Sequence, residues 1–118
     1  MNKIDLIQTI AGKPSSIEFG FIMAFIDQNY AYRPARFVNG LGSSAVINEA
    51  GTNEGSCKIF ALGKLLGLDE QATLACFGRY YRIDVLGNSA GEDHANIRNF
   101  MKYGWDGILF DSNALTAK

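Results

Sequence analysis

The sequence predicts an α+β fold in which about five helices pack around a small sheet of three short strands. Apolar residues recur at helical spacing in several segments, and most of these segments end at a glycine. Three shorter segments rich in β-branched and aromatic residues are bounded by turn residues, which is typical of strands. The chain has 118 residues without a repeat or a linker, so we expect one domain over 1–118.

Two helices are predicted in the first quarter of the chain. Helical spacing over 4–11 predicts the first helix, which a following glycine and proline end. Ser15 and Glu18 have the spacing of a capping box and predict a second helix over 16–29. Its expected core-facing residues are Phe21, Ile22, Phe25 and Ile26.

A hairpin and a longer helix are predicted next. The segments 36–39 and 45–48 are separated by a stretch rich in glycine and serine, so we expect them to pair as two strands. Residues 48–55 are expected to form a loop. Ser56 is then the expected N-cap of a helix that ends at Gly67.

Two more helices are predicted in the second half of the chain. Asp69 is the expected N-cap of a helix whose apolar face continues to residue 86. Asp93 is the expected N-cap of the last helix, which ends before Gly104. The residues expected to face inward from this last helix are Ile97, Phe100 and Met101.

The last segment of the chain is expected to supply the third strand. Residues 107–111 have the composition of a strand, and 112–118 are expected to form a loose tail. Trp105, which lies between two glycines, is expected to pack the last helix against this strand.

Composition and charge exclude several classes of function. The net charge is −1 and the pI is about 5.7, so the chain lacks the basic charge that draws proteins to nucleic acid or anionic membranes. No apolar run reaches the ~20 residues that a membrane-spanning helix needs. Cys57 and Cys76 are expected to be reduced thiols in a cytoplasmic protein, with Cys76 packed in the core. No metal-ligand spacing is present, and we expect no cofactor.

Blocks that cover most of the chain resemble the HopJ-type protein family, which is named for a type III secretion effector of plant-pathogenic bacteria. The residues that carry the resemblance lie in the blocks 17–19, 37–40, 48–60, 74–82 and 93–101. The resemblance implies a small bacterial protein called an effector by homology, without an established enzymatic mechanism. We therefore expect it to act through a binding surface for an unknown protein partner. Export by a type III system is implied by the resemblance alone.

Cys57 and His94 suggest a small thiol-dependent hydrolase or acyltransferase as an alternative. With Ser56 as the N-cap, Cys57 would lie in the first helical turn, where the helix dipole lowers the pKa of a thiol. His94 is the single histidine and would act as general base, oriented by Asp93 or Asn99. The simpler interpretation is that Cys57 fills space beneath a turn and His94 lies on a surface helix.

A second alternative is the binding of a small anionic ligand by the loop 48–58. Backbone N–H groups that precede a helix can hold an anion, and Lys58 would add positive charge. The candidate ligand-binding residues are Asn48, Glu49, Asn53, Ser56, Lys58 and Arg98. The spacing of Gly51, Gly55 and Lys58 is not that of a nucleotide-binding P-loop.

Overall fold

The computed structural model describes residues 1–118 and contains five α-helices, one π-helix and two small antiparallel sheets. The helices are α1 (Lys3–Gly12), α2 (Phe19–Asn29), α3 (Glu54–Leu66), α4 (Glu70–Ala75) and α5 (Ala95–Tyr103), with a π-helix over Tyr80–Val85. The strands are β1 (Tyr30–Tyr32), β2 (Phe37–Asn39), β3 (Val46–Asn48), β4 (Ile108–Phe110) and β5 (Leu115–Ala117). The α+β class is therefore confirmed. None of the helices has the length and apolar character needed to cross a membrane.

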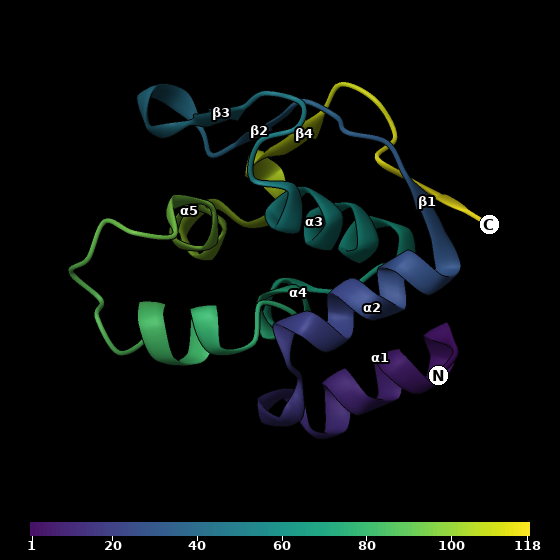
Figure 1. Ribbon diagram of the computed structural model, residues 1–118. Helices are drawn as coiled ribbons and strands as arrows, with labels where there is room; N and C mark the ends of the chain where they lie inside the picture. Colours follow the sequence, from purple (N-terminus) through teal and green to yellow (C-terminus); the bar gives the residue numbers. More distant parts are fainter.

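Helix α3 forms the centre of the molecule. Figure 1 shows it between the strands β2, β3 and β4 on one side and the helices α2 and α4 on the other. Its Phe60 is fully buried, and the Phe60 ring centroid lies 5.8 Å from that of Phe37 on β2 and 4.9 Å from that of Phe100 on α5. Trp105 packs edge-on against the Phe60 and Phe100 rings, so it packs α5 as predicted, but against α3 and not against the final strand. Because α3 packs against other elements on both sides, these contacts fix the position of its N-terminus.

The predicted hairpin and the predicted third strand form one sheet in the order β3-β2-β4. Phe37 on β2 lies opposite Asn48 on β3 and Phe110 on β4. Phe37 and Asn48 are both buried, so this row of the sheet faces α3 and α5. The three-stranded sheet thus carries a buried asparagine toward the helices, where it can bond to them.

The expectation of a loose tail is wrong, because the C-terminal residues form a second sheet. Strand β5 pairs antiparallel with β1, and Leu115 lies opposite Tyr32. Leu115 is 3% exposed, so the tail is anchored by a buried side chain as well as by the strand bonds. The N–H of Lys118 donates to the carbonyl of Asn29. The sequence signal for this strand was weak because it has only three residues, and its partner lies far away in the chain.

The predicted capping box before α2 does not form. Pro14–Ser16 adopt a 3₁₀ turn, and the helix begins three residues later than predicted, at Phe19. Glu18 precedes the helix without capping it, and its carboxylate instead lies 3.5 Å from Arg82. The apolar stripe of α2 is also narrower than predicted, since Phe21 is 41% exposed.

The helix predicted from Asp69 to residue 86 is broken in two. Asp69 does cap α4 through a hydrogen bond from the Ala72 N–H, but the α-helix ends at Ala75. Gly78 has φ +60°, and the chain continues as a π-helix. A Cβ at position 78 would lie 2.7 Å from the backbone nitrogen of Phe19, so the break is tied to the contact with α2.

Candidate functional site

The N-termini of α3 and α5 are capped by two residues with unusual backbone conformations. Asn53 precedes α3 with φ 49°, and His94 precedes α5 with φ 52°. They are the only non-glycine residues with positive φ. The predicted N-caps, Ser56 and Asp93, are therefore wrong, although both residue types are preferred at such positions. The left-handed conformation of both true caps requires outside support, because it is sparsely populated by most residues.

A network of asparagine side chains, three of them buried, holds Asn53 and the first turn of α5. The Asn96 Nδ2 donates to Asn48 Oδ1 at 2.8 Å, and Asn48 Nδ2 donates back to Asn96 Oδ1 at 3.1 Å. Asn53 Nδ2 donates to the same Asn48 oxygen at 2.7 Å. Asn39 Nδ2 donates to both the side-chain oxygen and the carbonyl of Asn96. We call Asn39, Asn48, Asn53 and Asn96 the asparagine network. It joins the sheet to the first turns of both helices.

Each of these two helices begins with backbone N–H groups that have no hydrogen-bond partner. In α3, the first N–H group with a partner is that of Cys57, which donates to the carbonyl of Asn53. In α5, it is that of Arg98, which donates to the carbonyl of His94. Neither cap side chain bonds to the helix that it precedes. The N–H groups of residues 54–56 and 95–97 are therefore free donors at the positive ends of two helix dipoles.

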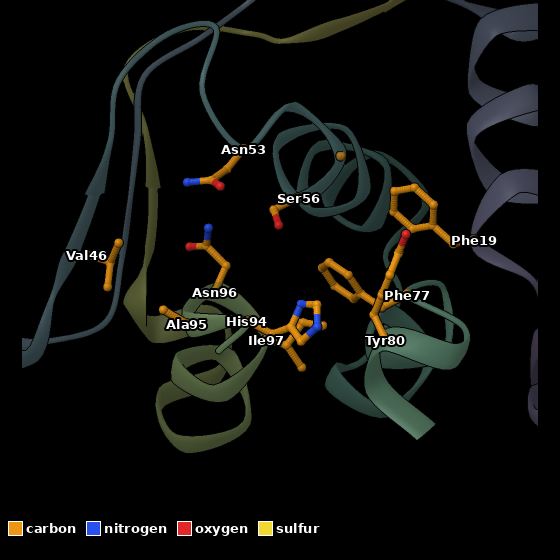
Figure 2. Close-up of a pocket in the computed structure, with 11 residues that line it drawn as sticks. Phe19, Val46, Asn53, Ser56, Phe77, Tyr80, His94, Ala95, Asn96 and Ile97 are labelled. Atoms are coloured by element: carbon orange, nitrogen blue, oxygen red, sulfur yellow. The ribbon is translucent and has the colours of Figure 1, made fainter. Parts of the chain in front are cut away.

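Both helix ends open onto one pocket of about 370 Å³. We call it the central pocket. Its lining residues are Phe19, Val46, Asn53, Gly55, Ser56, Phe77, Tyr80, His94, Ala95, Asn96 and Ile97. Figure 2 shows the Ser56 hydroxyl and the His94 ring pointing into the same space, with Phe19, Phe77 and Tyr80 on one side of it. The pocket thus combines aromatic walls with polar groups from α3 and α5.

The ring of His94 is held from two directions. Its Nε2 lies 3.1 Å from Asp84 Oδ2 on the π-helix, and the ring centroid lies 5.3 Å from that of Tyr80. Its Nδ1 makes no hydrogen bond to the protein. Asp93 lies further away, with Oδ2 3.8 Å from Nε2. The Arg98 guanidinium donates to Asp93 at 2.6 Å and holds the pKa of that carboxyl below its usual range.

Cys57 lies outside the central pocket. Its thiol is 1% exposed and its Sγ is 3.7 Å from the carbonyl oxygen of Ala35. Burial raises the pKa of the Cys57 thiol, so the predicted lowering of this pKa by the helix N-terminus is wrong. Cys57 is the fourth residue of α3, not the first, and no hydrogen bond joins it to His94. The pairing of Cys57 with His94 stays a prediction that no contact supports.

The other predicted site residues are divided between the central pocket and its surroundings. Lys58 turns away from the pocket and pairs with Asp27 at 3.5 Å, with its Nζ 4.7 Å from the Tyr32 ring centroid. Glu49 pairs with Arg36 at 3.1 Å. These two charges are therefore not available to a ligand in the central pocket.

Asn99 has a structural position beside the pocket. Its Nδ2 donates to the carbonyls of Asn39 and Ser44, each at 2.9 Å, and so ties α5 to the hairpin. Arg98 is committed to Asp93, whose carboxylate and carbonyl it contacts at 2.6 Å. Among the predicted residues, only Asn53, Ser56 and His94 line the pocket.

Sequence reasoning missed Asp84 and the aromatic pair Phe19 and Tyr80, whose ring centroids are 5.1 Å apart. These residues lie on the π-helix and at the start of α2, two places where the predicted elements were incorrect. A helix in α-register would turn Tyr80 and Asp84 toward other neighbours. In the sequence, these segments were marked by the family resemblance, which includes the blocks 17–19 and 74–82.

Between about pH 7 and 9, Cys57 in the folded chain is expected to react with iodoacetamide at least about tenfold more slowly than in the urea-unfolded chain. Only the thiolate reacts, and burial both raises the pKa of the Cys57 thiol and keeps the reagent away from it. Cys76 is fully buried and burial raises its pKa to about 12, so it provides an internal comparison that should react even more slowly. Peptide mapping by mass spectrometry measures both rates. Equal rates for Cys57 in the folded and unfolded chain would contradict its burial.

A comparison with protein-family models agrees with the resemblance found in the sequence, and a second comparison found a similar solved structure. The family model described as HopJ type III effector protein matches residues 3–115. A solved structure described as the crystal structure of unknown function protein VPA0580 is similar with a TM-score of 0.94 and 52% identity. The match covers 100% of this chain and 95% of that chain. No curated protein matches the chain.

Proposed function

Because this chain belongs to the HopJ type III effector protein family, whose name specifies no reaction, we propose a function from its central pocket: the protein binds a small ligand with an apolar body and an anionic head. The observation that carries this proposal is the meeting of two helix N-termini with unpaired N–H groups, a free hydroxyl and aromatic side chains at one pocket. An effector role outside the cell rests on the family name alone, and ligand binding does not depend on it.

The polar part of the pocket suits an acceptor of hydrogen bonds. Residues 54–56 and 95–97 carry unpaired N–H groups at the positive ends of α3 and α5. The Ser56 hydroxyl makes no hydrogen bond in the protein and adds a further donor. The nearby acids are already committed, since Asp84 contacts His94 and Asp93 contacts Arg98. A carboxylate or phosphate would therefore meet donors with little repulsion.

The apolar part of the pocket suits a flat or branched group. Phe19 and Tyr80 pack edge to face, and Phe77, Ile97 and Val46 complete the walls. Gly55 contributes to this surface because a Cβ there would lie 2.7 Å from the Phe19 ring. The ring thus packs directly on the first turn of α3. A small aromatic anion would place its ring against these residues and its charge near the helix ends.

Hydrogen bonds hold the helix ends at the pocket in place without a ligand. The asparagine network holds Asn53 and, through Asn96, the first turn of α5, and three of its members, Asn39, Asn48 and Asn96, are at most 7% exposed. Asn99 adds bonds between α5 and the hairpin. Ligand binding to preorganised donors costs less conformational entropy than binding that must order them, which favours measurable affinity for a small molecule.

Phenyl phosphate is expected to bind in the central pocket, with benzyl alcohol weaker and benzylamine weakest, because the donors favour a negative charge. Titration of the ¹⁵N-labelled protein followed by NMR measures the affinity. The largest amide shifts should occur at residues 54–56 and 95–97. Shifts spread over the surface, or equal affinity for the anion and the amine, would contradict the proposal.

An Ala95→Asp variant tests the same proposal by placing a negative charge at the pocket. The carboxylate should weaken phenyl phosphate binding at least about tenfold by repulsion at close range. An aspartate in the first turn favours the helix dipole, so loss of binding would not result from unfolding. The matched control is Ala90→Asp, which changes an exposed residue outside the pocket and should leave the affinity unchanged. Equal binding by both variants would place the ligand elsewhere.

A further inference from the structure

Asp84 and His94 have the arrangement of an orienting acid and a general base. The acid accepts from the Nε2 side of the ring at 3.1 Å, so the proton of the neutral imidazole belongs on Nε2. Nδ1 then carries the lone pair, and it has no hydrogen-bond partner in the protein. Tyr80 lies beside the ring, with centroids 5.3 Å apart, and limits its rotation. The acid comes from the π-helix, a rare element that occurs frequently at functional sites.

Ser56 is the hydroxyl that faces this base across the central pocket. It is the third residue of α3, and it neither caps the helix nor bonds to any other group. Figure 2 shows its oxygen directed into the space that the His94 ring also enters. No hydrogen bond joins the two residues, but nucleophile and base often reach bonding distance only when substrate binds.

The backbone around Ser56 completes the arrangement. The N–H groups of Gly55 and Ser56 are unpaired and adjacent to the hydroxyl, at the positive end of α3. Donors in this position stabilise an oxyanion that forms on a carbonyl under attack. Aromatic and aliphatic walls formed by Phe19, Phe77 and Ile97 lie next to the same space and suit an apolar acyl group.

We propose that Ser56, His94 and Asp84 form an acyl-transfer site that accepts esters or thioesters of small apolar acids. The assignment rests on the proposed ligand-binding function of the same pocket. Ser56 Oγ attacks the acyl carbon while its proton moves to His94 Nδ1, and the alcohol or thiol leaves with that proton. Water then attacks the acyl-serine and gives a proton to His94, and His94 passes this proton to Ser56 Oγ as the bond between Oγ and the acyl carbon breaks and the acid is released. Asp84 is a positioning residue that holds the imidazole in the required tautomer.

A fluorophosphonate probe is expected to label Ser56. The reaction forms a bond between Oγ and phosphorus, breaks the phosphorus–fluorine bond, and releases fluoride. Intact-mass measurement and peptide mapping identify the labelled residue. Ser56→Ala should abolish labelling, whereas the matched control Ser15→Ala, an exposed serine outside the pocket, should label like the wild-type protein. Labelling at another residue, or labelling that persists in Ser56→Ala, would overturn the assignment.

Hydrolysis of p-nitrophenyl butyrate tests the roles of the other two residues. His94→Gln should lower kcat at least about a hundredfold, as expected for loss of a general base. Asp84→Asn should lower kcat at least about tenfold with KM nearly unchanged, since an amide nitrogen facing Nε2 would favour the wrong tautomer. Asp84→Glu should restore part of kcat. A rise of KM alone in Asp84→Asn would assign this residue a structural role and overturn its assignment as a positioning residue.

Binding of phenyl phosphate separates failure of this inference from failure of the proposed function. The anion should protect Ser56 of the wild-type protein from the fluorophosphonate probe. If phenyl phosphate binds in the pocket and Ser56 remains unlabelled, the acyl-transfer proposal is wrong and ligand binding stands. If neither occurs, both are wrong.

Discussion

Replacing Asn96 by alanine is expected to lower the free energy of unfolding by about 3 kcal/mol. The change removes hydrogen-bond partners of buried amide groups, and each buried group left without a partner costs ~1–3 kcal/mol. Asn96 is 7% exposed, and its side chain bonds to Asn39 and Asn48, which are buried more deeply. Urea unfolding followed by circular dichroism measures the change. As a control, Asn113→Ala alters an exposed asparagine without a side-chain bond and should change stability by less than about 0.5 kcal/mol.

The partner of Asn96 in the network provides a stricter test. Asn48→Ala should also destabilise the protein, and the double variant should be less destabilised than the sum of the two single variants. We expect a coupling energy of about 1–3 kcal/mol, since each single change leaves the other amide buried and unpaired. Additive effects would mean that the two amides do not act as a unit.

The asparagine network also explains why the helix N-termini were predicted incorrectly. Local rules favour Ser56 and Asp93 as N-caps, and both residues do lie within three positions of the true caps. Asn53 is held by Asn48 on β3, and the first turn of α5 is held by Asn39 on β2, which is 57 residues from Asn96 in the sequence. No local pattern contains that information.

Features that depend on neighbouring residues were predicted well. Gly67 and Gly104 end their helices, and Asp69 caps α4, because each of these effects needs only a few adjacent residues. The hairpin of β2 and β3 follows from two short strand segments and a flexible connection. Strand β5 was missed because it pairs with β1, which is distant in the sequence.

The candidate site illustrates the same division. The sequence predicted a reactive thiol at Cys57, whereas in the structure Cys57 is buried and Ser56 lines the central pocket. The N-cap lies at Asn53 and not at the predicted Ser56, and in this register the Cys57 thiol is in the core while Ser56 faces the pocket. A change of three residues in a helix boundary corresponds to about 300° around the helix axis. Boundary errors of this size therefore decide which side chain a site contains.

Gly78→Ala is expected to destabilise the protein by about 3 kcal/mol, the sum of a left-handed conformation that costs a non-glycine residue ~1–2 kcal/mol and a steric clash of similar size. The φ of Gly78 is +60°, and an added Cβ would lie 2.7 Å from Phe19 N and 3.3 Å from the Ile17 carbonyl oxygen. These are backbone atoms, so no side-chain rotation can relieve the contact. Urea unfolding with an unchanged m-value measures the loss.

The control for Gly78 is Gly20→Ala, which adds the same methyl group inside α2. Nothing lies within 4 Å of a Cβ at Gly20, so this variant should gain about 0.5–1 kcal/mol from higher helix propensity. Equal stability of the two variants would contradict the close approach at Gly78. Because Phe19 forms a wall of the central pocket, Gly78→Ala should also weaken phenyl phosphate binding, whereas Gly20→Ala should not. The glycine that interrupts the chain between α4 and the π-helix is therefore expected to hold a wall of the site in place.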